Sequence, residues 1–150
     1  MTVVDRPTLE TNILIYSIDV SEGEKHERAK RLVDALLLRG ATLPLQVLNE
    51  LYFVCTRKKI LPASAIESYN HSLLTCMEII PPIAADLVAA MRLHQSDGQQ
   101  FFDALLLTTA ARAGCKTFFS EDLQHGRSFG SLQIVNPFAL TAIEFEQLFA

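Results

Sequence analysis

The amino-acid sequence predicts a single α/β domain, spanning residues 1–150, in which helices flank a mostly parallel sheet. Three observations lead to this prediction. The chain has 150 residues, a length that suits one domain with a sizeable core. Short apolar runs alternate with segments of helical periodicity, and no linker or internal repeat interrupts them. Hydrophobic residues make up 49% of the chain and charged residues 20%, which excludes disordered and low-complexity chains.

The first third of the chain contains one ambiguous element. An extended stretch ends at Leu9, and the apolar run from Asn12 to Ile18 fits a strand or a helix by periodicity alone. Ser21 is expected to open a helix, because Glu24 follows it in capping-box spacing. Gly40 ends that helix in the usual position for a left-handed cap. Its inner face is a stripe of four residues, Ala29, Leu32, Val33 and Leu36.

Prolines and glycines set several later boundaries. A proline favours the first turn of a helix and a glycine the residue after its last turn, so Pro62 begins one helix and Gly114 stops another. Helical periodicity predicts helices at Leu45 to Arg57, Pro62 to Leu74, Ala84 to His94, Phe101 to Ala113 and Thr141 to Phe149. Short apolar runs predict strands at Ala41 to Leu43, Cys76 to Ile80, Lys116 to Phe119 and Leu132 to Val135.

Charge and cysteine usage limit the function classes. The net charge of −4 argues against a protein that grips nucleic acid by bulk positive charge. An acidic protein that acts on a polyanion needs bound cations to reverse the local sign. No window is apolar enough for a membrane span, and Asp5 and Glu10 fall where a signal peptide needs its apolar core. Cys55, Cys76 and Cys115 are widely spaced among apolar residues, as in buried thiols of a cytoplasmic protein, the location we expect.

Four of the seventeen acidic residues stand at unusual places. Glu10 directly follows the first extended stretch, and Asp122 follows the predicted strand that ends at Phe119. Glu50 and Asp103 lie on core-facing stripes of two predicted helices. Burying a lone carboxylate costs several kcal/mol unless a partner or a metal ion compensates. Ligand sites of parallel sheets lie beyond the carboxyl ends of the strands, so the four acids together predict a site for Mg²⁺ or Mn²⁺.

Each acid taken singly also has a structural interpretation. Asp103 could be a helix-start residue that the helix dipole stabilises. Asp122 or Glu121 could cap the turn after the strand, and Glu50 could lie on the surface. A receiver-like phosphate-handling domain would also gather acids and Mg²⁺, but it would want a late Lys, and none follows Lys116.

The segments LETNILIY, QVLNELYFVCTRK, FFDALLLTTAARAGCKTFFSEDLQHG and QIVNPF together resemble the PIN-domain ribonucleases, in particular the VapC-type toxins of type II toxin–antitoxin systems. The resemblance spans Leu9 to Phe138. It implies a PIN-like three-layer fold and four acids around one or two divalent metal ions, at Glu10, Glu50, Asp103 and Asp122. Asn12 and Ser120 match polar positions that hold the acids or metal-bound water. Glu121 lies beside the fourth acid and could substitute for it or contribute.

The activity that the resemblance implies is metal-dependent endonucleolytic cleavage of RNA by a toxin. Mg²⁺ or Mn²⁺ would activate the water that hydrolyses the phosphodiester. The implied partners are the RNA substrate, a cognate antitoxin protein and a second copy of the chain in a homodimer, with no membrane. Among the basic residues that could contact RNA, Arg57, Lys58 and Lys59 follow Glu50 on its helix, although cations there also suit the helix dipole. Other candidates are Arg112, Lys116 and Arg127.

One departure from the family pattern leaves an alternative function open. The family opens with Asp-Thr-Asn, whereas this sequence has Glu10-Thr11-Asn12. The additional methylene moves the carboxylate by roughly an ångström, and a misplacement on that scale can reduce a rate by about 10²-fold. The chain would then be a catalytically weakened PIN-like module that binds RNA or antitoxin. Comparing its RNA cleavage with that of Glu10→Asp would discriminate the two.

Overall fold

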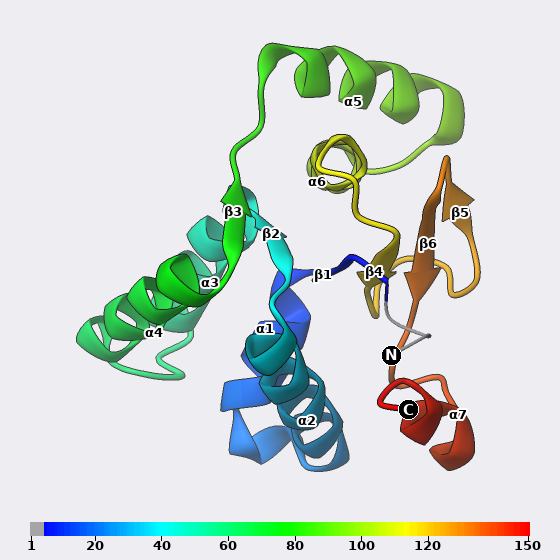
Figure 1. The fold of residues 1–150 in the computed structure, drawn as a ribbon. Coiled ribbons are helices and arrows are strands. Elements are labelled where there is room, and N and C mark those ends of the chain that lie inside the picture. Colours follow the sequence, from blue (N-terminus) through cyan, green and yellow to red (C-terminus); the bar gives the residue numbers. More distant parts are fainter. Residues whose placement is uncertain (1–4) are drawn as a thin grey trace.

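A computed structural model describes residues 5–150 of the chain (Figure 1), so the first four residues of the predicted domain lie outside the described residues. The strands are β1 Pro7–Leu9, β2 Thr42–Pro44, β3 Glu78–Ile80, β4 Thr117–Phe119, β5 Ser128–Phe129 and β6 Leu132–Val135. The helices are α1 Thr11–Ile18, α2 Glu24–Arg39, α3 Leu45–Arg57, α4 Ala63–Cys76, α5 Ala84–Asp97, α6 Phe101–Arg112 and α7 Ala142–Gln147, with a 3₁₀ turn at Val20–Glu22.

The hydrogen-bonded strands are mostly parallel. One sheet has the order β1-β4-β6-β5, in which β1 pairs with β4 and β4 with β6 in parallel, while the short β5 runs antiparallel to β6. A second, parallel pair is β2 with β3. Figure 1 shows α1 and α2 below β1 and β4, and α6 above them. The prediction of an α/β fold with helices flanking a mostly parallel central sheet is confirmed.

The register of the sheet places the ends of two central strands together. Leu9 pairs with Phe119, so β1 and β4 finish at the same edge. The residues that follow, Glu10 after β1 and Ser120 after β4, therefore emerge side by side. This edge is the carboxyl end of the parallel strands, where ligands bind in such sheets.

The ambiguous run in the first third of the chain is a helix. α1 buries Ile13, Leu14 and Ile15, which lie on different sides of the helix. Because a helix buried on several sides carries no polar face, periodicity could not separate it from a buried strand. Among the largest buried side chains are Phe118 and Phe119, neighbours in β4, which shows that β4 is covered on both faces.

Two details of the sequence analysis are wrong. The expected capping box of Ser21 and Glu24 is absent, because Ser21 donates through both its N–H (3.1 Å) and its hydroxyl (2.6 Å) to Asp19 Oδ1, in a 3₁₀ turn that precedes the helix. α2 begins only at Glu24, after Gly23 has turned the chain with a φ of 61°. Cys76 is exposed rather than buried, since it is the last residue of α4, whereas Cys55 and Cys115 are buried.

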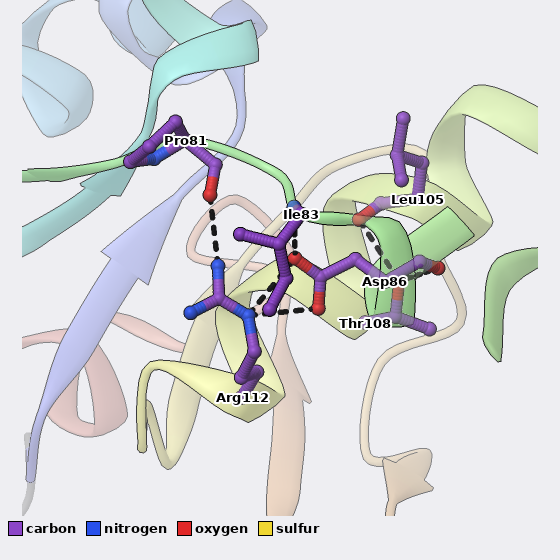
Figure 2. Close-up of polar contacts among 6 residues, drawn as sticks. All are labelled: Pro81, Ile83, Asp86, Leu105, Thr108 and Arg112. Carbon is purple, nitrogen blue, oxygen red and sulfur yellow. Dashed lines mark hydrogen bonds and ion pairs between the residues drawn. The ribbon is translucent and has the colours of Figure 1, made fainter. Parts of the chain in front are cut away.

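α5 is attached to the molecule through α6. Arg112 of α6 donates from Nε to both carboxylate oxygens of Asp86 (2.9 Å each) and from Nη2 to the carbonyl of Pro81 (2.8 Å), as Figure 2 shows. The same carboxylate accepts a hydrogen bond from the N–H of Ile83 (2.9 Å), the residue before the helix. Thr108 adds a hydrogen bond to the Asp86 carbonyl at 3.2 Å. A buried ion pair therefore joins the start of α5 to the end of α6.

The rest of α5 contributes little to the core. Its fully buried residues are Asp86 and Ala90, and the apolar side chains of Leu87, Val88 and Met91 are exposed. In Figure 1 this helix is the outermost element above α6. Within residues 5–150, no helix is long and apolar enough to cross a lipid bilayer.

Candidate functional site

Glu10 occupies the junction of β1 and α1. Its backbone N–H donates to the carbonyl of Phe119 (3.0 Å), which continues the pairing of β1 with β4. Its carboxylate turns into the protein, with 7% of the residue exposed. Ser120 Oγ donates to Glu10 Oε2 (2.7 Å), and the backbone N–H of Glu121 donates to Glu10 Oε1 (2.9 Å). Both carboxylate oxygens are therefore held by the segment that follows β4.

Glu10 binds its proton unusually tightly for a carboxylic acid. Burial raises its pKa to about 7, although the hydrogen bonds from Ser120 and from Glu121 N–H act in the opposite direction. The negative charge of Asp122 adds to the increase. No Lys or Arg among residues 5–150 forms an ion pair with Glu10.

Glu50 reaches the same edge from α3. Thr11 Oγ1, the residue after Glu10, donates to Glu50 Oε2 at 3.0 Å. Gln46, one turn earlier on α3, donates from Nε2 to Glu50 Oε1 (2.8 Å) and to the carbonyl of Phe102 (3.1 Å). Gln46 thus joins two acid-bearing helices, because Phe102 precedes Asp103 in α6. Sequence reasoning missed Gln46, and the available signal was its i−4 spacing from Glu50.

Asp103 lies in the first turn of α6, where its backbone N–H donates to the side-chain oxygen of Gln100 (3.1 Å). Burial raises the pKa of Asp103, and the charges of Asp122 and Glu50 raise it further. Asp103 therefore lies within electrostatic range of both Asp122 and Glu50.

Asp122 belongs to the segment after β4 and faces α1. Asn12 Nδ2 donates to Asp122 Oδ2 at 3.0 Å. The three consecutive residues Glu10, Thr11 and Asn12 therefore contact, respectively, the segment after β4, Glu50 and Asp122. This tripeptide connects three elements that are far apart in the sequence.

Glu121 is turned away from the other acids. Its carboxylate accepts a hydrogen bond from Tyr16 Oη (2.5 Å) and forms an ion pair with Lys25. Burial alone would raise the pKa of Glu121, but the hydrogen bonds from Lys25 and Tyr16 and the Lys25 charge lower it overall. From the sequence, we expect that Glu121 could substitute for Asp122. In the structure its carboxylate is already bound by Tyr16 and Lys25.

The chemistry of this donor set fits a divalent cation. The ion pairs within residues 5–150 all involve other acidic residues. None of them includes Glu10, Glu50, Asp103 or Asp122. In this conformation, no three or more His, Cys, Asp or Glu side chains of the described residues are placed so that they could hold a metal ion together. The charge of Asp122 raises the pKa of Glu10 and of Asp103, and Glu50 also raises that of Asp103; a hard cation such as Mg²⁺ or Mn²⁺ would relieve this repulsion.

Most basic side chains considered for RNA contact are engaged elsewhere. Arg112 is paired with Asp86, Arg127 with Asp97 and Lys116 with Asp5. In the basic cluster at the end of α3, Arg57 lies over the ring of Phe53, 5.2 Å from its centroid.

One sizeable hollow is unrelated to the acids. A cavity of about 520 Å³ is lined by Arg6, Thr42, Glu78 and Ala113, among others, near the amino-terminal ends of β1, β2 and β3. The acids stand at the opposite, carboxyl-terminal ends of β1 and β4, where ligand sites of parallel sheets occur. Chemistry and topology therefore favour the acidic edge over this hollow as the functional site.

Comparisons with known proteins agree on the fold. The family model described as "PIN domain" matches residues 8–127. A solved toxin–antitoxin complex from Klebsiella pneumoniae has 18% identity and a TM-score of 0.63, with 89% of this chain and 99% of that chain covered. VapBC2 from Rickettsia felis, bound to a promoter DNA fragment, has 19% identity and a TM-score of 0.62, covering 85% and 96%.

A third similar structure is VapC20 of Mycobacterium tuberculosis, described as a toxin that cleaves the sarcin–ricin loop. It has 19% identity and a TM-score of 0.59, with 77% of this chain and 91% of that chain covered. No curated protein matches the chain. At these identities the solved structures establish a shared fold.

Proposed function

This chain belongs to the PIN domain family, and from that premise we propose that it is a metal-dependent endoribonuclease, the toxin of a type II toxin–antitoxin pair. The observation that supports the proposal is Glu10, buried after β1 without a Lys or Arg partner among residues 5–150. The two residues that follow it, Thr11 and Asn12, donate hydrogen bonds to Glu50 and Asp122. A buried carboxylate without a cation, such as that of Glu10, is unfavourable in a protein that only needs to fold. Carboxylates are the ligands that a hydrolytic divalent metal requires.

In the proposed site, the acidic side chains would bind the metal ion and neighbouring polar side chains would orient them. Glu50 and Asp122, both oriented by neighbouring side chains, would hold Mg²⁺ or Mn²⁺ together with Asp103, and Glu10 is the most buried member of the set. When bound, such an ion lowers the pKa of water and supplies a nucleophile near neutral pH. Thr11, Asn12 and Gln46 keep the carboxylates in place through the hydrogen bonds described above.

The proposed partners follow from the family and from the similar structures. VapC20 is described as cleaving an RNA loop, and the Klebsiella and Rickettsia structures are toxin–antitoxin assemblies. We propose RNA as the substrate of this chain, an antitoxin protein as its inhibitor and the cytoplasm as its location. We also propose a homodimer, since Leu87, Val88 and Met91 of α5 form an exposed apolar surface.

The second candidate function is a PIN-like binding module with weakened catalysis. A specific observation favours it: both carboxylate oxygens of Glu10 are hydrogen-bonded within the protein, to Ser120 and to Glu121 N–H. A ligand with both oxygens engaged has to share them with a metal ion. Glu10→Asp is the discriminating variant, and cleavage of RNA only after this substitution would establish the binding module.

RNA cleavage by the purified chain tests the main proposal. We expect an RNA with single-stranded loops to be cut with Mg²⁺ or Mn²⁺ and left intact with EDTA. Asp103→Asn should abolish cleavage, whereas Asp34→Asn, which alters an exposed ion pair with Lys30 on α2, should leave it unchanged. Failure of both the wild type and Glu10→Asp to cut any RNA with either metal would overturn the nuclease function.

Metal binding can be measured without any substrate. A ligand that binds only the folded protein raises its melting temperature, and at 100 times Kd the stabilisation is about 2.7 kcal/mol. For a chain of this size we expect a shift of about 5–10 °C. The shift should disappear in Asp103→Asn, and a wild type that shows none at millimolar Mn²⁺ would exclude the metal site.

A further inference from the structure

Three side chains from separate elements meet beside the proposed site: Tyr16 of α1, Lys25 of α2 and Glu121 after β4. We call them the Glu121 clamp. Tyr16 Oη donates to Glu121 Oε2 (2.5 Å), and Lys25 Nζ donates to Glu121 Oε1. The Glu121 carboxylate is 22% exposed, so both donors reach a largely desolvated acceptor.

Aromatic contacts hold the donors of the Glu121 clamp in place. Lys25 Nζ lies 5.2 Å from the ring centroid of Tyr16 and 5.7 Å from that of Phe138. The two rings pack edge to face with centroids 5.4 Å apart. His26, next to Lys25 on α2, contacts the Tyr16 carbonyl through Nδ1 at 2.8 Å. Although the Lys25 side chain is 42% exposed, the two aromatic rings and the neighbouring helix restrict its position.

The Glu121 clamp connects directly to Glu10. The backbone N–H of Glu121 donates to Glu10 Oε1, and the adjacent Ser120, fully buried, donates its hydroxyl to Glu10 Oε2. The side chain of Glu121 thus points to α1 and α2 while its backbone points to the acids. Anchoring the side chain restricts the backbone of the segment that aims both donors at Glu10 and also carries Asp122.

We propose that Glu121 is a positioning residue, whose carboxylate is held by Tyr16 and Lys25 so that its own N–H and the Ser120 hydroxyl fix Glu10 for metal binding. This inference rests on the proposed function. It assigns Glu121 a role different from that of a metal ligand. It also assigns Tyr16 and Lys25 to the support of the site.

The test removes the donors and leaves Glu121 intact. Tyr16→Phe deletes the hydroxyl, Lys25→Met deletes the charge while keeping the chain length, and Lys25→Arg preserves the ion pair. Lys30→Met is the matched control, because it breaks an ion pair with Asp34 on the same helix far from Glu121 in the sequence. Three readouts apply: hydrogen exchange of the Glu121 amide, Mn²⁺ affinity by calorimetry, and kcat and KM for RNA cleavage.

We expect Tyr16→Phe and Lys25→Met to accelerate exchange of the Glu121 amide and to weaken Mn²⁺ binding by about tenfold or more. The loss of rate should appear in kcat rather than in KM, because the misplaced acids act on the reacting phosphate. Lys25→Arg should restore all three readouts and Lys30→Met should change none. Unchanged amide exchange and unchanged Mn²⁺ affinity in both clamp variants would overturn the inference, since a merely structural contact would lower only the melting temperature.

The exchange measurement also separates this inference from the proposed function. The Glu121 amide reports on the clamp in the metal-free wild type, without substrate. If neither the wild type nor Glu10→Asp cuts RNA but exchange is faster in the clamp variants, the nuclease function would be overturned while the positioning role would be supported. If the clamp variants cut RNA normally and exchange the Glu121 amide at the normal rate, the nuclease function would be supported and the positioning role of Glu121 would be overturned.

Discussion

At the scale of single residues, two buried acids show how a site is separated from a structural contact. Asp86 and Glu10 are similarly hidden, with 2% and 7% of each residue exposed. Asp86 is paired with Arg112 and caps the start of α5, so its burial is compensated within the fold. Glu10 has hydrogen bonds but no cation among residues 5–150. A buried carboxylate without a charged partner indicates a functional site, and Glu10 places that site at the edge where β1 and β4 end.

The raised pKa of Glu10 predicts a pH-dependent stability of the metal-free protein. Between pH 4.5 and about 7 the unfolded chain has released this proton while the folded chain retains it, so stability falls as pH rises. The loss attributable to Glu10 is about 3 kcal/mol between pH 4 and pH 8. Glu10→Gln cannot titrate and should lack this component in urea unfolding measured in EDTA. Parallel pH profiles of the two proteins would contradict the assignment.

Gln46 carries a second prediction at this scale. Gln46→Leu removes the amide that joins Glu50 to the Phe102 carbonyl, and we expect Mn²⁺ affinity to fall by about tenfold or more because Glu50 loses its orientation. Calorimetry gives the affinity. Gln95→Leu, on the exposed side of α5, is the matched control and should bind normally. Equal affinities for both variants would remove Gln46 from the site.

At the scale of elements, the site depends on how helices meet the sheet edge. α1 starts directly after Glu10, at the place where β1 and β4 end, and its Thr11 contacts Glu50 of α3. α6 contributes Asp103. α5 supplies none of the four acids. Its role within the chain is to cover α6, and the Asp86–Arg112 pair is the main polar connection between the two helices.

Breaking that pair should destabilise the protein without destroying the site. Arg112→Met leaves the Asp86 carboxylate buried and unpaired, and we expect a loss of about 2–3 kcal/mol, in the lower part of the range because Arg112 is one-third exposed. Urea unfolding measures the loss. Adding Asp86→Asn should recover part of it, because the uncompensated charge is then gone. A single variant as stable as the wild type would show that the pair contributes nothing.

At the scale of the whole molecule, an acidic protein with an acidic edge is proposed to act on a polyanion. Bound divalent cations would reconcile the net charge of −4 with this substrate by reversing the sign locally. The candidate cations Arg112, Lys116 and Arg127 are already engaged in ion pairs. The metal ions would therefore supply much of the positive charge that meets the phosphate.

The proposed homodimer gives a prediction at the same scale. If α5 is the contact between two copies, Leu87→Glu should convert a dimer into a monomer, because it places a charge in the exposed apolar surface of that helix. Light scattering coupled to gel filtration measures the mass. Leu38→Glu is the matched control, since Leu38 is 89% exposed on α2 and lies outside this surface. A wild-type monomer, or a Leu87→Glu dimer, would contradict this contact.

The sequence by itself determined the fold class, most element positions and the set of acids to consider. Helix α3 at Leu45–Arg57 and strand β6 at Leu132–Val135 match the predicted bounds. Periodicity is recorded within one or two turns of chain, so it can be read without a structure. The two-residue strand β5 at Ser128–Phe129 was missed, because so short a segment has no period.

Only the tertiary structure decided that the apolar run after Glu10 is a helix, that Asp86 is paired with Arg112 26 residues away, and that Glu121 faces Tyr16 and Lys25. It also decided that Ser120 meets Glu10 across 110 residues. The physical reason is the same in each case. Whether a side chain is buried, paired or unpaired depends on partners that folding brings from distant parts of the chain, and no local pattern records them.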